Sequence, residues 1–394
     1  MNSFEYHLPT KIIFGKGAEE KVGAEISSRG VKRVLIVYGG GSVVKSGLLE
    51  RVESSLRDAQ IAYLPFGGVV PNPRVETARE GVQKAIAFGA ELILAVGGGS
   101  VIDTAKGIAH GVANPEIDIW KFWAREATLT KTIPVGVILT ISAAGSETSD
   151  SAVLQNSETH SKRGINTPLN RPAFAILNPE LTYTLPKYQI ACGATDIMMH
   201  TMERYFTQAD GNDLTDAFAE ALLKTVIKNG KAALENPCDY HAMSELMWCG
   251  SISHNGLTGL GGVGDWATHQ LGMQLGAIYD IAHGASLSIM WPCWAKYVRG
   301  EKIDRFAKFA RNVWGVENPD DDAAALEGIE KTAQYFASLG MPVKMSDAPE
   351  IGVKSDEEIR ALTFGTTWEG KRTIGSFMKL GYEEIYEIFR AANV

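Results

Sequence analysis

Two apolar, β-branched runs in the first half of the chain end in the same turn, Gly-Gly-Gly-Ser, and a helical pattern follows each. The runs are Val34–Tyr38 and Leu92–Val96, and the turns occupy 39–42 and 97–100. An uninterrupted apolar run of this length is typical of a strand buried on both faces of a parallel sheet. The repeated strand–turn–helix unit therefore predicts an α/β fold with a doubly wound parallel sheet.

Further patterns divide the chain near residue 185. Before that point, additional strands are predicted at 12–14, 62–66, 135–140 and 173–177, and helices at 18–28, 42–59, 75–88 and 101–113. Beyond it nearly every apolar pattern has the period of a helix, at 190–207, 213–235, 239–256, 265–278, 284–299, 301–314, 323–339, 355–366 and 381–392. We expect an α/β domain at 1–185 and an all-α domain at 186–394, with any ligand site in a cleft between them.

Composition excludes several classes of protein. The 394 residues exceed the roughly 250–300 that one core usually holds, and the net charge of −8 argues against a nucleic-acid or anionic-membrane surface. The N-terminus lacks a basic start followed by an apolar run, and no stretch approaches the roughly twenty apolar residues of a membrane span. The cytoplasm is the expected location. The four cysteines lack C-x-x-C spacing, so neither structural zinc nor a disulfide framework is expected.

The second half carries side chains suited to a divalent metal. Asp196 and His200 are four residues apart, which places them one turn apart on one face of a helix. On a single straight helix His269 and His283 would lie roughly 20 Å apart, so they can face each other only if the chain turns back at 279–280. One carboxylate and three imidazoles suit zinc or ferrous iron. Spacing alone equally allows buried core histidines with ordinary hydrogen-bond partners.

The Gly-Gly-Gly-Ser turns suit a phosphate group. Each would aim backbone N–H groups and a helix N-terminus at an anion, and glycine lets the ligand approach the backbone. A third turn rich in small residues lies at 142–146. Neither triple-glycine turn matches G-x-G-x-x-G or G-K-[ST], and the glycines could instead only tighten the turns. An acidic residue after the first strand would repel the 2′-phosphate of NADP. Gly39 stands at that position and carries no carboxylate, so NADP is favoured over NAD.

Together these motifs resemble those of the iron-containing (group III) alcohol dehydrogenases. The shared pattern comprises GGGSVIDTAK at 97–106, SAAGSE at 142–147, the Asp196/His200 pair, His269 and His283 followed by glycine. The resemblance covers essentially the whole chain. Within the family the chain looks most like the branch of NADP-using butanol dehydrogenases and broad-range aldehyde reductases, which shares the YGGGS turn. It implies a dinucleotide-binding α/β domain, an all-helical metal domain and a homodimer, for which an edge strand near 5–14 could pair with a second copy.

The resemblance also implies roles for individual residues. The implied ligands of one divalent ion, Fe²⁺ or Zn²⁺, are Asp196, His200, His269 and His283. The implied cofactor contacts are Gly40, Gly41 and Ser42 at the adenosine ribose, Gly97, Gly98, Gly99 and Ser100 at the pyrophosphate, Thr140 near the adenine or ribose, and Lys162 near a hydroxyl or phosphate. Asp103 would lie near the nicotinamide and substrate. Asp103 and His283 are the expected catalytic residues.

Two positions depart from the pattern of the family. Met273 stands where many relatives carry a further histidine, so the final proton is expected to pass through water or a ribose hydroxyl. Ala144 stands where relatives often carry a threonine, which removes one hydroxyl contact to the cofactor. Candidates for an apolar substrate wall, of which at least half are expected to be core residues instead, are Trp120, Phe122, Trp123, Trp266 and Met273.

The reaction expected from these features is reversible hydride transfer between NADP(H), or NAD(H), and a short- to medium-chain alcohol or aldehyde such as butanol or butanal. One alternative is a metal-dependent lyase resembling dehydroquinate synthase. Such a site must bind a polyanionic substrate, and the second half shows no basic cluster near its ligands. Another alternative is a non-catalytic NADP- or metal-binding protein, against which the intact ligand set and glycine turns argue.

Overall fold

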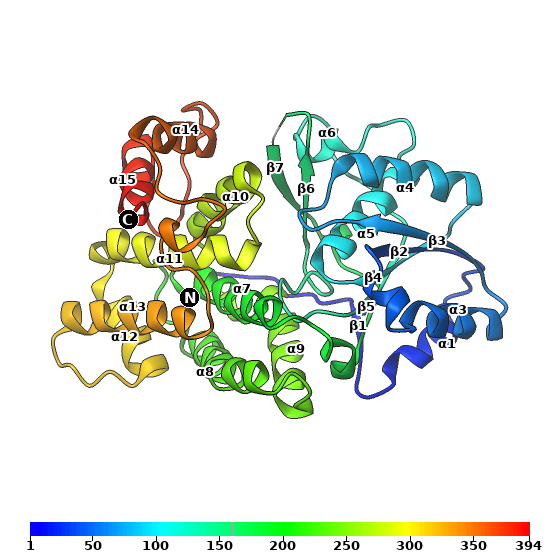
Figure 1. The fold of residues 1–394 in the computed structure, drawn as a ribbon, viewed down its shortest axis with the longest axis horizontal. Coiled ribbons are helices and arrows are strands. Elements are labelled where there is room, and N and C mark those ends of the chain that lie inside the picture. Colours follow the sequence, from blue (N-terminus) through cyan, green and yellow to red (C-terminus); the bar gives the residue numbers. More distant parts are fainter. Residues whose placement is uncertain (160) are drawn as a thin grey trace. The chain divides into compact units, whose positions relative to one another are not determined.

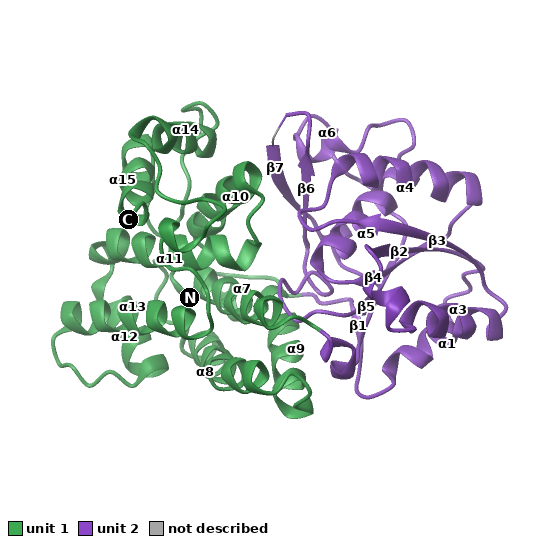
Figure 2. Cartoon of the chain, in the orientation of Figure 1, with its two compact units in different colours: residues 1–6, 185–394 green, residues 7–184 purple. Residues whose placement is uncertain are grey.

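The computed structural model describes residues 1–159 and 161–394. The chain forms two compact units, which are coloured purple and green in Figure 2. We call residues 7–184 (purple) the first unit and residues 1–6 with 185–394 (green) the second unit. The first six residues pack with the second unit, where the Asn2 N–H donates to the Gly261 carbonyl at 2.9 Å. That residues 1–185 and 186–394 fold as two independent domains stays a prediction.

The first unit is built on a six-stranded sheet with the strand order β1-β8-β5-β4-β2-β3 (Figure 1). All neighbouring strands run parallel. The strands are β1 (Lys11–Phe14), β2 (Arg33–Gly39), β3 (Ala62–Val69), β4 (Leu92–Gly97), β5 (Val135–Leu139) and β8 (Phe174–Leu177). β4, β5 and β8 are buried along their whole length, as their apolar sequences require. The predicted doubly wound α/β fold is confirmed.

Helices cover both faces of this sheet (Figure 1). They are α1 (Val22–Ser27), α2 (Ser42–Lys45), α3 (Leu48–Asp58), α4 (Val75–Phe88), α5 (Gly99–Ala113) and α6 (Trp120–Trp123). Alternate strand residues such as Val34 and Ile36 pack in one cluster with Val22 of α1 and Val52 of α3, because successive side chains of a strand point to opposite faces. The single helix predicted at 42–59 is broken in two, since Gly47 adopts a left-handed conformation with φ of 72°.

An antiparallel hairpin in the first unit was not predicted. It consists of β6 (Ser151–Asn156) and β7 (Ser161–Asn166). β7 reads SKRGIN, which lacks the alternation of apolar and polar residues that identifies a half-buried strand in a sequence. The hairpin is anchored by the fully buried Ala152 and Leu154 of β6 and by backbone contacts, among them the bond from the Gln155 N–H to the Pro73 carbonyl at 2.8 Å.

The order of the strands reverses between β2 and β4. From β2 the sheet continues to β3 on one side, and from β4 it continues to β5 and β8 on the other. The carboxyl ends of parallel strands on either side of such a reversal form the ligand crevice of doubly wound folds. The two Gly-Gly-Gly-Ser turns leave the sheet at these two strand ends.

The second unit is helical, as predicted. Its helices are α7 (Lys187–Tyr205), α8 (Asp213–Glu235), α9 (Tyr240–His254), α10 (Ala267–Tyr279), α11 (His283–Val298), α12 (Ile303–Trp314), α13 (Asp321–Ser338), α14 (Asp356–Thr366) and α15 (Tyr382–Ala392). α7 is the central one and packs against α8, α9 and α11. Part of the core is aromatic, and the rings of Phe206 and Phe306 stack with centroids 4.3 Å apart. Of the helices in the described residues, none combines the length and hydropathy needed to cross a bilayer.

A substitution in the sheet tests how tightly the first unit is packed. A Cβ added at Gly136 of β5 would lie 2.2 Å from the Phe174 ring on the neighbouring strand, and Phe174 is fully buried. We expect Gly136→Ala to lower the free energy of unfolding by about 1–3 kcal/mol, measured by urea denaturation. Gly164→Ala in β7 is the control, because its Cβ would meet Val153 at 3.5 Å, an ordinary contact. Equal losses in both variants would contradict the packing argument.

Candidate metal centre and nucleotide site

α7 presents two of the predicted metal ligands on one face. Asp196 and His200 lie one helical turn apart, with Asp196 Oδ1 3.4 Å from His200 Nδ1. Their side chains are only 5% and 6% exposed, because α7 is the central helix of its unit. The α7 positions around them are almost all buried and apolar or small, so these two polar side chains lie in the interior of the unit.

The chain does turn back at 279–280, the condition for the two distant histidines to meet. α10 carries His269 near its start and ends at Tyr279, where Asp280 takes a left-handed conformation with φ of 52°. α11 then begins at His283. The ring centroids of His269 and His283 are 5.3 Å apart, a small fraction of their separation along a straight helix.

Two glycines allow the close helix contacts that this arrangement requires. A Cβ at Gly272 of α10 would lie 2.8 Å from Ser286 Oγ of α11, and one at Gly284 of α11 would lie 2.4 Å from the Cys192 carbonyl of α7. Because Gly284 follows His283 directly, its contact with α7 brings the His283 ring toward Asp196. His283 Nε2 lies 3.8 Å from Asp196 Oδ1.

The predicted ligands therefore converge on one place inside the helical unit. His269 Nε2 also lies 3.8 Å from Asp196 Oδ1, and single ligand atoms of Asp196, His200 and His269 all lie within 4.8 Å of one another. Asp196 Oδ1, His200 Nδ1 and His269 Nε2 are buried and make no hydrogen bond to any described residue. Buried polar atoms are normally paired, so three unpaired ones facing the same point form a donor set that fits a divalent cation.

Burial and neighbouring charges set the protonation of these imidazoles in opposite directions. Burial, together with the neighbouring His254 and His269, lowers the pKa of His200 well below its usual range. Burial also acts against the charged form of His269, but the carboxylates of Asp196 and Glu203 outweigh it and raise the pKa of His269 to about 9. His200 is thus neutral, the form in which an imidazole binds a metal.

Sequence reasoning missed residues around this cluster. Glu203 of α7 accepts two hydrogen bonds from His269, and the His254 ring lies 4.0 Å from the His200 ring, centroid to centroid. Trp266, which the sequence did suggest as a wall residue, packs edge-on against His269 at 5.3 Å. Only one signal in the sequence pointed to Glu203, namely a carboxylate on the same helical face as Asp196 and His200.

The three glycine-rich turns meet at one edge of the sheet in the first unit. They follow β2, β4 and β5, which are neighbours in the sheet, and the Thr140 N–H after β5 donates to the Gly97 carbonyl at 3.2 Å. α5 begins at Gly99, so Gly99 and Ser100 lie in its first turn. Within the described residues no side chain caps this helix start, which suits an anion there.

The reason for glycine differs between the turns. A Cβ at Gly98 would lie 2.1 Å from Ile141, and one at Gly97 would lie 2.6 Å from Val101. Packing within the chain therefore accounts for these two glycines. At Gly40 and Gly41 a Cβ would meet nothing within 4 Å, so the space beside this turn is open to a ligand. The β2 turn, rather than the β4 turn, carries the stronger argument for a cofactor cradle.

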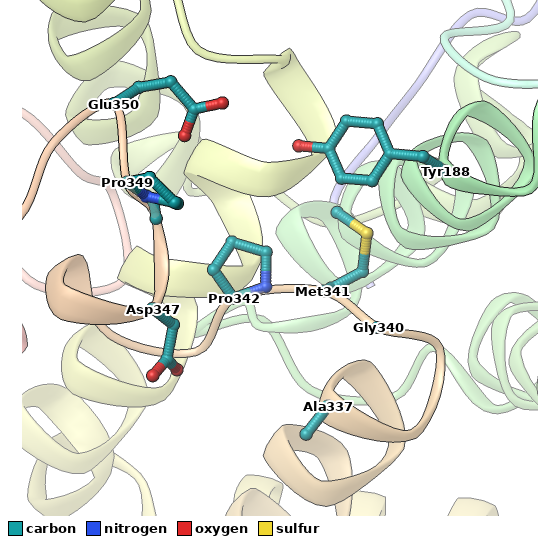
Figure 3. A pocket seen from close by; sticks show the side chains of 9 residues that line it. Tyr188, Ala337, Gly340, Met341, Pro342, Asp347, Pro349 and Glu350 are labelled. Carbon is teal, nitrogen blue, oxygen red and sulfur yellow. The ribbon is translucent and has the colours of Figure 1, made fainter.

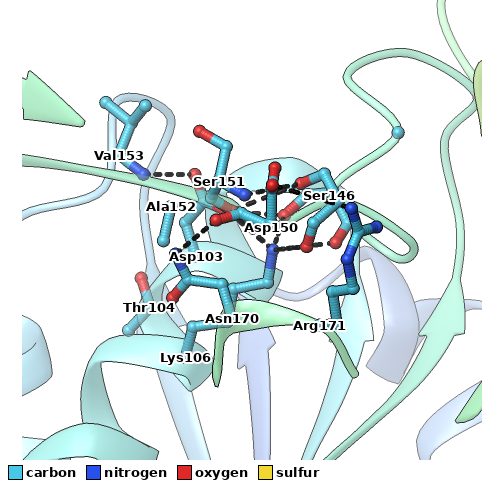
Figure 4. Close-up of polar contacts among 12 residues, drawn as sticks. Asp103, Thr104, Lys106, Ser146, Asp150, Ser151, Ala152, Val153, Asn170 and Arg171 are labelled. Atoms are coloured by element: carbon cyan, nitrogen blue, oxygen red, sulfur yellow. Dashed lines mark hydrogen bonds and ion pairs between the residues drawn. The ribbon is translucent and has the colours of Figure 1, made fainter. Parts of the chain in front are cut away.

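Asp103 and Lys106 tie the third turn to α5 (Figure 4). Asp103 accepts hydrogen bonds from Ser146 Oγ at 2.6 Å and from the Val153 N–H at 2.8 Å. The fully buried Lys106 ammonium donates to the carbonyl oxygens of Ser146 and Ser151 at 2.8 and 2.7 Å. Burial raises the pKa of Asp103 and lowers that of Lys106 to about 8. Both Asp103 oxygens are held by the chain itself, and a catalytic role for Asp103 stays a prediction.

The remaining predicted residues lie in varied surroundings. Lys162 of β7 donates to Asn72 Oδ1 at 2.8 Å, in the loop after β3. Phe122 and Trp123 are 3% and 1% exposed, and the Trp123 indole donates to the Ala152 carbonyl, so both belong to the core. Trp266, in contrast, packs against an imidazole of the metal cluster.

A separate cavity of about 370 Å³ lies in the helical unit, between the start of α7 and the segment after α13 (Figure 3). Tyr188, Met341, Pro342 and Glu350 are among the residues that line it. None of the residues predicted to bind metal or cofactor is part of its wall. The cavity is therefore lined by other residues than those of the metal cluster.

Comparisons with known proteins agree with the geometry. Residues 9–179 match the family described as iron-containing alcohol dehydrogenase, and residues 190–393 match its C-terminal family. The chain is 41% identical to NADH-dependent butanol dehydrogenase A of Clostridium acetobutylicum, over 99% of both chains. It is 39% identical to the NADPH-dependent aldehyde reductase YqhD of Escherichia coli, over 88% of this chain and 89% of that one.

A solved structure extends the agreement to the fold. The crystal structure of NADH-dependent butanol dehydrogenase A from Thermotoga maritima matches with a TM-score of 0.96 and 36% identity, over 100% of this chain and 99% of that one. The chain belongs to the iron-containing alcohol dehydrogenase family. It is an oxidoreductase of the alcohol dehydrogenase and aldehyde reductase type, and the lyase and the non-catalytic alternatives are set aside.

The Lys106 contacts generate a stability prediction. Lys106→Met keeps most of the side-chain volume but leaves the Ser146 and Ser151 carbonyls and the Asp103 carboxylate without their buried cation. We expect the free energy of unfolding to fall by about 3–5 kcal/mol, measured by urea denaturation at pH 7. Lys84→Met, in an exposed ion pair with Glu80 on α4, should cost less than about 1 kcal/mol. A Lys106→Met loss no larger than that of Lys84→Met would show that the contacts contribute little.

Proposed function

We propose that this protein reversibly reduces short- to medium-chain aldehydes such as butanal with NADPH, or with NADH, at a divalent metal, Fe²⁺ or Zn²⁺, held by Asp196, His200, His269 and His283. Membership of the family supplies the class of reaction. One observation carries the metal assignment: unpaired, buried nitrogen and oxygen atoms from α7 and α10 face the same point.

The chain's own residues account for the character of this centre. A bound divalent ion supplies Lewis acidity, which polarises an aldehyde oxygen or lowers the pKa of an alcohol. Asp196 is the one carboxylate among the four ligands, so a bound dication and its ligands would together carry a net charge of about +1. This positive charge favours a developing alkoxide. Burial keeps His200 neutral and its lone pair available. Trp266 packs edge-on against the His269 ring.

The nicotinamide cofactor is proposed to bind along the carboxyl ends of β2, β4 and β5. Gly40, Gly41 and Ser42 would contact the adenosine ribose, Gly97 to Ser100 the pyrophosphate, and Thr140 and Lys162 the neighbouring groups. NADP is favoured because Gly39 offers no carboxylate to repel a 2′-phosphate and Ser42 is exposed beside it. Relatives of both preferences exist, since the butanol dehydrogenase is NADH-dependent and YqhD is NADPH-dependent.

Three further properties belong to the proposal. Met273, partly buried on α10, cannot carry a proton, so the final proton would pass through water or a ribose hydroxyl. β1 forms one edge of the sheet, and an edge strand is a suitable place for a second copy to form a homodimer. The strand begins at Lys11 rather than near residue 5, so the pairing region is shorter than the sequence indicated. A cytoplasmic location is the third property.

Metal removal and a ligand variant test the proposed reaction. Prolonged chelation should abolish NADPH-dependent reduction of butanal, followed at 340 nm, and one divalent ion should restore it. His283→Ala should lower kcat by about 1000-fold or more, because several kcal/mol of Lewis-acid stabilisation are lost, and should lower the metal content found by elemental analysis. His241→Ala, an exposed histidine of α9, is the control. Full activity of the chelated protein or of His283→Ala would refute metal catalysis.

Cofactor preference has its own test at Gly39. A Cβ there would lie 3.4 Å from the Val69 carbonyl, so a side chain fits with little movement. An aspartate would repel a 2′-phosphate and accept a hydrogen bond from a free ribose. We expect Gly39→Asp to lower kcat/KM for NADPH relative to NADH by about tenfold or more, since one charge contact contributes about 1–2 kcal/mol. An unchanged ratio would place the adenosine ribose elsewhere.

A further inference from the structure

A buried carboxylate outside the predicted ligand set makes all of its described hydrogen bonds to one histidine. Glu203 lies on α7, three residues beyond His200, and its side chain is 1% exposed. Its Oε1 accepts from the backbone N–H of His269 at 2.8 Å and pairs with His269 Nδ1 at 2.9 Å. Among the described residues its Oε2 has no hydrogen-bond partner.

These two contacts determine how His269 presents its ring. An ionised carboxylate can only accept, so His269 Nδ1 must carry the proton in the bond to Glu203. The other nitrogen, Nε2, then faces Asp196 Oδ1 at 3.8 Å. The backbone bond holds the start of α10 against α7, so one carboxylate oxygen controls both the position of His269 and the rotation of its ring.

A second contact from the same residue strengthens this attachment. The Asp265 N–H donates to the Glu203 carbonyl at 2.7 Å, and the Asp265 carboxylate accepts from the Ala267 N–H at 3.1 Å. The segment that leads into α10 is therefore tied to α7 immediately beside Glu203. Histidines that bind metals usually donate their second ring N–H to a carboxylate in this manner.

Charge also distinguishes Glu203 from an ordinary buried carboxylate. In the described part of the chain its ion-pair partner is the imidazole of His269, and neither lysine nor arginine pairs with it. A divalent cation bound at His269 Nε2 would add positive charge on the side of that ring opposite Glu203. By contrast, the buried Glu220 of α8 accepts from Tyr205 Oη and Asn312 Nδ2 and needs no cation.

We propose that Glu203 is a positioning residue of the metal centre, which directs His269 Nε2 toward the ion and increases the affinity of the site for a divalent cation. The inference rests on the proposed function, because it takes His269 as a metal ligand. It adds a residue that touches neither the substrate nor the ion.

Metal binding, rather than turnover, tests this role. The variants are Glu203→Gln, which keeps the shape and removes the charge, Glu203→Ala, which removes both, and Glu203→Asp, which keeps the charge on a shorter side chain. The control is Glu220→Gln. Zn²⁺ affinity is measured on the metal-free protein by competition with a chromophoric chelator, and ligand geometry by the visible absorption of the Co²⁺-substituted protein. Circular dichroism establishes that each variant is folded.

We expect Glu203→Gln to bind Zn²⁺ about 10–100-fold more weakly than the wild type. Glu203→Ala should bind it at least as weakly as the Gln variant and show an altered Co²⁺ spectrum, while Glu203→Asp should recover part of the affinity. Glu220→Gln should match the wild type in both measurements. If Glu203→Ala does not fold, the Gln variant decides the question alone.

The failures of the two proposals are distinguishable. Wild-type Zn²⁺ affinity and a wild-type Co²⁺ spectrum in both Glu203→Gln and Glu203→Ala would overturn the role of Glu203 and leave the metal site in place. An equal loss of affinity in Glu220→Gln would also overturn it, because the effect would then follow any buried carboxylate. A wild-type protein that binds neither Zn²⁺ nor Co²⁺ stoichiometrically would overturn the proposed function itself.

Discussion

The helical unit depends on the close packing of α11 and α10 against their neighbours, which brings three imidazoles around one carboxylate oxygen. Asp196 Oδ1 lies 3.4 to 3.8 Å from nitrogens of His200, His269 and His283. Any side chain at position 284 would collide with the α7 backbone, and one at position 272 would meet Ser286 of α11. The donors can therefore converge only because Gly272 and Gly284 have no side chains, and the presence of the histidines alone would not be enough.

The same unit contains buried charges of two kinds, and their hydrogen bonds separate structure from function. Asp216 is paired with Arg305 at 2.6 Å and with Lys308 at 2.6 Å, and these cations lower the pKa of Asp216 despite its burial. Such a satisfied network holds α8 and α12 together and leaves no capacity for a ligand. Asp196 and Glu203, in contrast, each keep a buried oxygen without a hydrogen bond to any described residue. An interior that satisfies its charges elsewhere leaves Asp196 Oδ1 unpaired beside unpaired nitrogens of His200 and His269, which is the physical mark of a cation site.

The glycine turns of the α/β unit show why a motif does not have one meaning. Gly97 and Gly98 make room for Val101 and Ile141, whereas Gly40 and Gly41 border open space. The turn sequences are identical, so their difference lies in what packs beside them and in the backbone, where Gly41 has a positive φ of 128° and Gly98 does not. Asp103 is similar: its place in a motif shared with the family suggested a contact to substrate, while in the structure both of its oxygens hold neighbouring segments.

The sequence by itself determined the class of fold, the placement of the helices and the Asp196/His200 pair, because these follow from periodicities and spacings within one element. It did not reveal the β6–β7 hairpin, because β7 lacks the apolar alternation of a half-buried strand, or the break at Gly47. Only the tertiary structure decided that His269 and His283 face Asp196, since this depends on the reversal at Asp280 and on contacts between helices far apart in sequence. Glu203 became visible for the same reason: its partner lies 66 residues away, and no local pattern records a hydrogen bond over that distance.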